Sequence, residues 1–245
     1  MDTTIEDLQD ALTAGRAIRE HGPYYVRVGR EGLDFRKVVL AHPVASGKAI
    51  LEAAETFPVD DYLLFRIARN GVTEELRPDS AVDLRSDGVE KFVVFRSDRA
   101  FRFMLDERAF DWGASRISGA TLKHLAGVDV DNQDVWQQAL GGSDLMIEDD
   151  GFADLAAAGV ERFVTRPVGL SIVVNAKRRE VFRRRLSYWE VVKLAFAAAQ
   201  KSDDIIYTIN YARGPHANPE GSMVEGQHVK IKENMVFYVT PTDRS

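Results

Sequence analysis

Apolar residues follow two periods along the chain, one typical of strands and one typical of helices. YYVRVG at 24–29 alternates like a half-buried strand, and GLDFRKVVL at 32–40 is predicted to be its returning partner. YLLFRIA at 62–68 and EKFVVFR at 90–96 are two further strand-like runs, and an Asn-Gly pair after the first of them predicts a turn. This region therefore predicts a small sheet built from four main strands.

A helix with one apolar face is predicted after each of three serines. Residues at four, seven and eight positions beyond Ser46, Ser118 and Ser187 are apolar, and these offsets fall on one side of a helix. Serine is also a favoured cap for the first helical turn. The apolar positions are Ile50, Ala53, Ala54, Leu122, Leu125, Ala126, Val191, Leu194 and Ala195.

The order of strands and helix returns twice along the chain. GVEKF at 88–92 and GVERF at 159–163 lie 71 positions apart, and an Asp-Leu pair precedes each at the same spacing. We therefore interpret the chain as a triple repeat with a period of about 70 residues. Strands of the later copies are predicted at FRFML (101–105), VWQQAL (135–140), ERFVTR (161–166), LSIVVN (170–175), EVFRRRL (180–186), IIYTINYA (205–212) and MVFYV (235–239).

Strand, strand, helix, strand, loop and strand within one repeat is an α+β plan, in which the helix covers one face of a mixed sheet. Each repeat is just long enough to bury a core of its own. The predicted divisions are an N-terminal helix at 1–21, repeat one at 22–97, repeat two at 98–167 and repeat three at 168–245.

The N-terminal segment belongs to none of the repeats. Ile5, Leu8 and Leu12 share one side of a helix, which predicts a short amphipathic helix. Two interpretations stay open, because this helix could pack on repeat one or dock a partner.

Composition narrows the class of protein. Hydrophobic residues make up 45% of the chain and charged residues 29%, which is ordinary for a globular protein. The start, MDTTIEDLQDAL, is acidic, and no run is long enough to span a membrane, so we expect neither a signal peptide nor a membrane helix. The absence of cysteine excludes disulfides and thiolate nucleophiles. These features predict a cytoplasmic protein.

Charge differs between the repeats. Repeat two has 7 basic and 13 acidic residues, a net charge of −6, whereas repeat three has 12 and 8, a net charge of +4. This difference would favour a head-to-tail contact between repeat three of one copy and repeat two of another. Neutral variation of solvated surfaces is the alternative interpretation.

The segment from FPVDDY to VVF at 57–95 resembles the second half of ubiquitin in layout. A proline-acid corner follows the helix, then an apolar strand, a tight turn, an Asp-led segment and a final strand. The three-unit arrangement, closed by GSMVEGQHVKIKENMVFYVTPTDRS, is similar to the bacterial multiubiquitin-domain proteins over about residues 22–245. The resemblance implies three tandem ubiquitin-like β-grasp domains behind a short helix.

The resemblance also implies a function. Such proteins are encoded beside homologues of ubiquitin-activating and ubiquitin-conjugating enzymes and an isopeptidase, in systems of which some resist phage. The chain would then be a modifier without catalysis of its own and without a catalytic cofactor. Similar triple-domain proteins form dimers and helical filaments with bound calcium. The alternative hypothesis is a calcium-responsive structural polymer or adaptor that is never conjugated.

The C-terminal sequence departs from the ubiquitin pattern. Ubiquitin-type conjugation uses a slim tail ending in Gly-Gly, whereas this sequence ends TPTDRS. Gly141-Gly142 follows a predicted strand and indicates a hairpin turn. Conjugation through Ser245, conjugation after trimming and no conjugation all stay open.

Acidic residues after the helix of repeat two are the candidate calcium ligands. Calcium prefers about six to eight hard oxygens. Asp129 and Asp131 offer carboxylates at alternating positions, and Asp149 and Asp150 follow in a second acidic run. Two copies could share a site to which each contributes half of the ligands. Solvated turn acids are the alternative interpretation.

Two other groups of residues indicate less. Arginine and lysine at 177–179 and 183–185 flank a predicted hairpin turn, so their side chains should point to both faces, and we expect docking to an acidic protein before nucleic acid. The five histidines lack helical metal spacing, and no phosphate loop or serine elbow follows a strand. We therefore expect no enzymatic activity.

Overall fold

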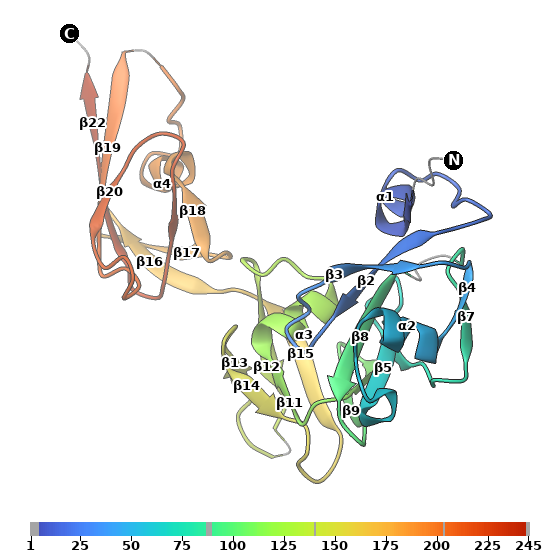
Figure 1. The fold of residues 1–245 in the computed structure, drawn as a ribbon. Helices are drawn as coiled ribbons and strands as arrows, with labels where there is room; N and C mark the ends of the chain where they lie inside the picture. Colours follow the sequence, from blue (N-terminus) through green and yellow to red (C-terminus); the bar gives the residue numbers. More distant parts are fainter. Residues whose placement is uncertain (1–4, 87–89, 140, 203, 244–245) are drawn as a thin grey trace. The chain divides into compact units, whose positions relative to one another are not determined.

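The computed structural model describes residues 5–86, 90–139, 141–202 and 204–243 (Figure 1). The chain forms two compact units. The first unit contains residues 1–128 and 134–165, and the second contains residues 129–133 and 166–245. No described helix is both long and apolar enough to cross a membrane.

Repeat one forms a mixed sheet with one helix, as predicted. The strands run in the order β2-β8-β5-β6, with β3 on the other side of β2, and β2 pairs parallel with β8. A small antiparallel pair, β4 with β7, flanks the helix. The elements are β2 (Tyr24–Gly29), β3 (Arg36–Leu40), β4 (Val44–Ser46), α2 (Gly47–Ala53), η1 (Val59–Asp61), β5 (Tyr62–Ile67), β6 (Thr73–Glu75), β7 (Ala81–Asp83) and β8 (Lys91–Arg96).

Repeats two and three have the same plan. In both, the first strand pairs parallel with the last, and the first two strands form an antiparallel hairpin. Repeat two contains β9 (Phe101–Leu105), β10 (Arg108–Trp112), β11 (Arg116–Ser118), α3 (Gly119–Ala126), β12 (Gln133–Gln137), β13 (Leu145–Ile147), β14 (Phe152–Asp154) and β15 (Glu161–Pro167). Repeat three contains β16 (Leu170–Val174), β17 (Lys177–Val181), β18 (Arg185–Ser187), α4 (Tyr188–Ala195), β19 (Ile205–Ala212), β20 (Gly221–Met223), β21 (His228–Lys230) and β22 (Val236–Asp243).

The three predicted serine caps are confirmed. Ser46, Ser118 and Ser187 all have extended backbone and accept a hydrogen bond from the third residue of the helix that follows. This bond satisfies one of the backbone N–H groups that a helix start leaves unpaired. The predicted strand at 180–186 is wrong, because the returning strand is β17 and the chain then bends into the short strand β18.

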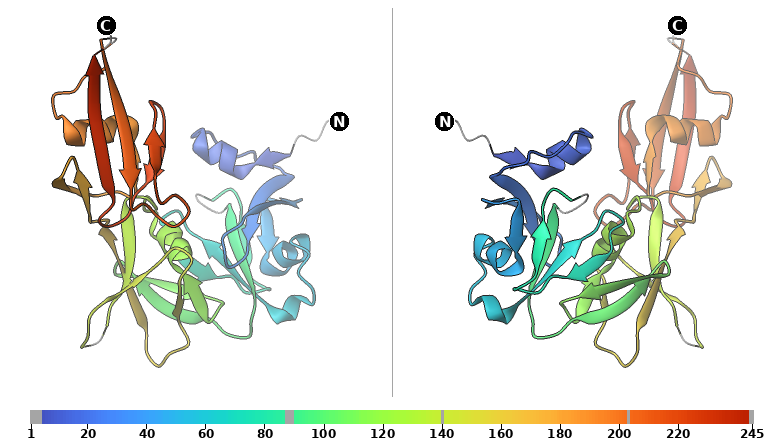
Figure 2. Two further views of the ribbon diagram at one scale, coloured as in Figure 1. Left: turned by 90° about the vertical axis from the view of Figure 1, so that its left-hand side faces the viewer. Right: turned by 90° about the vertical axis from the view of Figure 1, so that its right-hand side faces the viewer.

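The N-terminal segment packs on repeat one (Figure 2). Its helix, α1 (Leu8–Thr13), is shorter than predicted, because Asp7 caps it and the preceding β1 (Glu6–Asp7) pairs parallel with β2. Of the three residues expected on one helical side, Leu8 is fully buried in the core of repeat one, whereas Ile5 lies outside the helix. Of the two open interpretations, the structure shows the packing on repeat one.

Three hydrophobic clusters hold the chain together, but they do not divide as predicted. Repeats one and three each have a cluster made only of their own residues and, for repeat one, Leu8. The cluster of repeat two also includes five buried residues from repeat one, which are Leu33, Phe65, Ile67, Val93 and Phe95. The expectation of a separate core for each repeat is therefore confirmed for repeats one and three, and it is wrong for repeat two, whose core includes residues of repeat one.

Candidate interaction site

The sheet of repeat one has apolar residues on both faces. In strands β5 and β8, Leu64, Phe92 and Val94 face helix α2, and the alternate positions face away from it. We call the face turned away from the helix the outer face of a repeat. On this face Leu63 lies opposite Phe95 and Phe65 opposite Val93. The sequence signal for this burial was present, since YLLF and FVVF are continuous apolar runs, typical of strands buried on both sides.

Repeat two covers this outer face with strand β10 and helix α3. The rings of Phe95 and Trp112 meet edge to face, with centroids 4.6 Å apart, and both side chains are buried. Gly113 makes this approach possible, because a Cβ atom there would lie 2.5 Å from the ring of Phe95. The contact therefore depends on the large ring of Phe95 on the sheet and on the absence of a Cβ atom at Gly113 of repeat two.

Polar contacts fix the register of the two repeats. Thr73 donates its hydroxyl proton to the carbonyl oxygen of Asp111 over 2.5 Å, and Thr121 donates to the carbonyl of Glu31 over 3.2 Å. Gly71 approaches Leu125 so closely that a Cβ atom would lie 2.2 Å from its carbonyl oxygen, and the φ of Gly71 is +83°. The turn predicted at Asn70-Gly71 is thus confirmed and also serves the contact.

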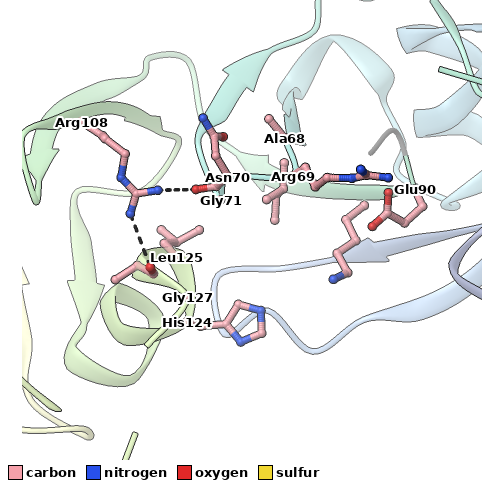
Figure 3. A pocket seen from close by; sticks show the side chains of 12 residues that line it. Ala68, Arg69, Asn70, Gly71, Glu90, Arg108, His124, Leu125 and Gly127 are labelled. Carbon is pink, nitrogen blue, oxygen red and sulfur yellow. Dashed lines mark hydrogen bonds between the residues drawn. The ribbon is translucent and has the colours of Figure 1, made fainter. Parts of the chain in front are cut away.

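A cavity of about 490 Å³ opens at one end of this contact (Figure 3). Arg108 bridges the two repeats there, because it donates hydrogen bonds to the carbonyl oxygens of Asn70 and Ala126. Arg69, Lys91 and His124 also line the cavity, together with one carboxylate, Glu90. Arginine and lysine side chains outnumber the carboxylate of Glu90 in the described lining, so its chemistry suits the binding of an anion.

The His124 imidazole is the titratable group most affected by this environment. Burial lowers its pKa below the ordinary 6.5, because it disfavours the charged form, and the nearby Lys91 charge lowers it further. The imidazole ring lies 6.3 Å from the ring of Phe35 in repeat one. Protonation of His124 is therefore less favourable in the folded chain than in the unfolded chain.

Asp129 and Asp131, two predicted calcium ligands, lie in the second unit. Asp129 accepts hydrogen bonds from the backbone of Asp131 (2.9 Å) and from the side chain of Asn132 (2.7 Å). Asp131 lies 3.7 Å from the guanidinium of Arg185 in repeat three, and its carbonyl accepts a bond from the backbone N–H of Arg184. These partners hold the loop after α3 against repeat three, and calcium would have to replace or share them.

Asp149 and Asp150, the other two predicted ligands, lie in the first unit. Asp149 is 2.7 Å from the ammonium group of Lys123, which also lies 3.8 Å from Asp134. Lys123 lies on the buried side of helix α3 and is only 1% exposed. Asp150 is exposed. The structure thus places a cation of the protein itself beside Asp149, which the sequence pattern did not reveal because Lys123 is distant in sequence.

Among the described residues, no three His, Asp or Glu side chains lie close enough together to hold a metal ion. A site shared between two copies, as predicted, stays a prediction.

The remaining predicted residues have structural surroundings. Gly141-Gly142 lies in the loop between the antiparallel strands β12 and β13, and Gly141 has a φ of +83°, a conformation that glycine adopts readily. Arg179 donates to the carbonyl of Leu194 over 3.0 Å, and Arg183 pairs with Glu190. Ser245, the predicted conjugation terminus, lies outside the described residues.

Comparison with known proteins agrees with the repeats. A sequence model described as multiubiquitin matches three segments, residues 30–97, 101–168 and 170–243. The second and third segments cover all strands of their sheets, whereas the first begins directly after β2 (Tyr24–Gly29). No curated protein sequence matches the chain at a significant level.

Proposed function

Because the chain belongs to the multiubiquitin family, we propose that it is a ubiquitin-like protein of a bacterial ubiquitination-like pathway and that it self-associates in the cytoplasm. The observation that carries this proposal is the threefold family match on three β-grasp sheets. Some pathways of this kind resist phage, and we extend the proposal to that role. The protein acts as a recognised surface and contributes no catalysis of its own.

The partners are an activating-like enzyme, a conjugating-like enzyme and an isopeptidase. The fused pair of repeats one and two supports this role, because its buried contact presents two β-grasp domains in one fixed arrangement. Such an arrangement lowers the ordering cost of binding a partner that touches both domains. Conjugation would proceed through Ser245 or through a residue exposed by trimming.

The test is mass spectrometry after incubation with the two enzymes and ATP. A covalent adduct of the protein on either enzyme, removed by the isopeptidase, is the expected result. The matched control is a conjugating-like enzyme whose nucleophile is replaced, which should abolish the adduct on that enzyme. Absence of any adduct with active enzymes would overturn the conjugation role.

A second candidate is a calcium-responsive structural polymer or adaptor that is never conjugated. The exposure of Asp129 and Asp150 supports it, because a calcium site shared between two copies needs carboxylates that a second copy can reach. The test is sedimentation velocity with and without calcium for the wild type and for Asp129→Asn/Asp131→Asn. Larger species with calcium in the wild type alone would support this candidate, and unchanged sedimentation would exclude it.

A further inference from the structure

Strand β17 forms one edge of the sheet of repeat three. On the neighbouring strand β16, the N–H of Val173 donates to the carbonyl oxygen of Met235 over 2.9 Å, on the side away from β17. Arg178 lies opposite Val173 in the antiparallel ladder, so the N–H and C=O groups of Arg178 and of Glu180 point away from β16. In the part of the chain that the structure describes, no strand pairs with this edge of β17.

A groove of about 320 Å³ adjoins this edge where β17 ends, between β17, β18 and helix α4. Its apolar lining comes from Val181, Phe182, Leu186 and Leu194. Phe182 is 62% exposed, so an apolar partner can reach its ring. An apolar groove beside an unpaired strand edge suits strand addition, in which the backbone of an extended segment pairs with the edge and alternate side chains enter the groove.

The equivalent edge of repeat two has a strand of repeat one beside it. Counted from the serines that cap α3 and α4, Asp111 of β10 takes the place of Glu180. Strand β6 of repeat one lies next to β10, and the hydroxyl of Thr73 donates to the carbonyl oxygen of Asp111 over 2.5 Å. This edge of the β-grasp sheet is therefore used for a contact once within the molecule.

The groove of repeat three cannot bind a folded sheet as repeat two does. A Cβ atom at Gly113 of repeat two would lie 2.5 Å from the ring of Phe95, and the place of Gly113 is taken in repeat three by the whole side chain of Phe182. That ring would overlap a sheet packed as closely as the sheet of repeat one. The groove therefore suits a single extended segment.

Charge indicates the kind of segment. Residues 177–193 contain seven basic and two acidic residues, a net charge of +5. Lys177, Arg178 and Lys193 are exposed, and none of the three forms an ion pair within the described residues. Lys177 and Arg178 lie at the start of β17, and Lys193 lines the groove. Acidic residues that flank an apolar segment would therefore meet cations.

The two carboxylates of this surface do not oppose an acidic segment. Glu190 pairs with Arg183 and accepts hydrogen bonds from the backbone N–H (2.8 Å) and the hydroxyl (2.7 Å) of Ser187. Glu180 alternates with the buried Val181, so its side chain points to the other face of the sheet. Neither carboxylate would be left unpaired beside the bound segment.

We propose that the edge of β17 and the adjoining groove bind an extended segment of another protein, in which an apolar core is flanked by acidic residues. The backbone of the segment pairs with Arg178 and Glu180. Its apolar side chains contact Phe182, and its carboxylates meet Lys177 and Lys193. This binding goes beyond the proposed function, because it needs neither conjugation nor calcium.

The test is a fluorescence anisotropy titration of the full-length chain into a fluorescein-labelled peptide with a valine and isoleucine core flanked by glutamates. The wild type should bind this peptide saturably, and more weakly as the salt concentration rises. Peptides with serine in place of the core, or with lysine in place of the glutamates, should bind about tenfold more weakly or less. A proline within the core should weaken binding as much, because proline cannot donate a hydrogen bond to the strand edge. Bound peptide should also slow the amide hydrogen exchange of Arg178 and Glu180.

Two variants test the residues. Phe182→Asp should weaken peptide binding about tenfold or more, because it removes a large apolar contact, and Lys193→Glu should weaken it about threefold at low salt. Both side chains are exposed, so both variants should keep the wild-type circular dichroism spectrum. The matched controls are Phe152→Asp in repeat two and Lys48→Glu in repeat one, which change exposed side chains in the same way and should bind like the wild type.

Three outcomes would overturn the proposal. One is a wild type that does not bind the peptide, and another is binding that neither Phe182→Asp nor the core proline weakens. The third is self-association of the wild type that Phe182→Asp abolishes, without peptide binding, because it would assign the groove to a second copy. Adduct formation with the activating-like enzyme should be the same in the wild type and in Phe182→Asp, which separates this binding from the conjugation role.

Discussion

The outer faces of repeats one and three have the same strand register and opposite chemistry. In repeat one, Leu63, Phe65, Val93 and Phe95 form two directly opposed apolar pairs that are covered by repeat two. In repeat three, the corresponding pairs are Thr208 with Thr240 and Asn210 with Tyr238, all exposed. The same β-grasp topology therefore has an outer face that is buried where its residues are apolar, as in repeat one, and exposed where they are mostly polar, as in repeat three.

This difference has an energetic consequence. Burying a large apolar side chain contributes about 1.5–3 kcal/mol, so the covered face of repeat one links the folding of repeats one and two. Repeat three has a cluster of its own and receives no such contribution from its outer face. The first unit should therefore unfold as one cooperative body.

Removing the aromatic side chains of Phe95 and Tyr238 one at a time tests this difference most directly. Phe95→Ala should lower the free energy of unfolding of the first unit by about 3–5 kcal/mol, because it opens a cavity against Trp112. Tyr238→Ala should cost about 1 kcal/mol or less, because Tyr238 is exposed. Urea unfolding followed by tryptophan fluorescence measures both. A Trp189→Phe background restricts the signal to Trp112 and Trp136 in the first unit for Phe95→Ala, and Trp189 is retained to report repeat three for Tyr238→Ala.

Amide hydrogen exchange in urea tests whether repeats one and two unfold together. The amides of β5 in repeat one and of β12 in repeat two should exchange at similar rates in the wild type, and Phe95→Ala should accelerate the exchange of both strands. Separate transitions for these two strands in the wild type would contradict the linked unit.

A second prediction compares helix α3 of repeat two with helix α4 of repeat three. On α4 the position of Lys123 is taken by the buried Val192, whereas Lys123 forms ion pairs with Asp149 and Asp134. Lys123→Leu should lower the free energy of unfolding of the first unit by about 1.5–3 kcal/mol, because a hydrogen bond to a charged group contributes about that much and the substitution removes it. Val192→Leu, which places the same leucine at the equivalent helix position of repeat three, is the control, and thermal unfolding by calorimetry measures both. An equal loss in the two variants would show that packing, not charge, stabilises this position.

The fold could be predicted from the sequence because its signals are local. Each serine cap lies next to the helix that it starts, and the strand alternation of IIYTINYA survives in β19, where polar residues point outward. The contact between repeats one and two could not be predicted as a contact, because it joins residues such as Phe95 and Trp112 through space. The partner of Asp149 was missed for the same reason, since nothing in the spacing connects it to Lys123.

A third prediction tests the close packing of Gly113 against the ring of Phe95. Gly113→Ala should destabilise the first unit by about 1–3 kcal/mol, because its Cβ atom would overlap the ring of Phe95 and force the two repeats apart. Gly169→Ala is the control, since no atom lies within 4 Å of a Cβ there, and its unfolding free energy should stay close to that of the wild type. In the double variant Gly113→Ala/Phe95→Ala the two losses should not add, because the overlap disappears with the ring. Simple additivity would contradict the proposed steric cause.

The last and weakest effect concerns pH. It distinguishes repeat two from repeat three, because Lys193 of repeat three takes the place of His124. Burial and the Lys91 charge lower the pKa of His124 in the folded chain below 6.5. Between that lowered pKa and 6.5 the unfolded chain binds more protons than the folded chain, so stability falls as the pH falls through this window and is retained above it. His124→Asn should flatten the decline in the urea midpoint of the first unit between pH 7 and pH 5, roughly the range in which histidine titrates. His228→Asn, in repeat three, should leave that decline as it is in the wild type, and a decline that persists without His124 would assign it to the carboxylates instead.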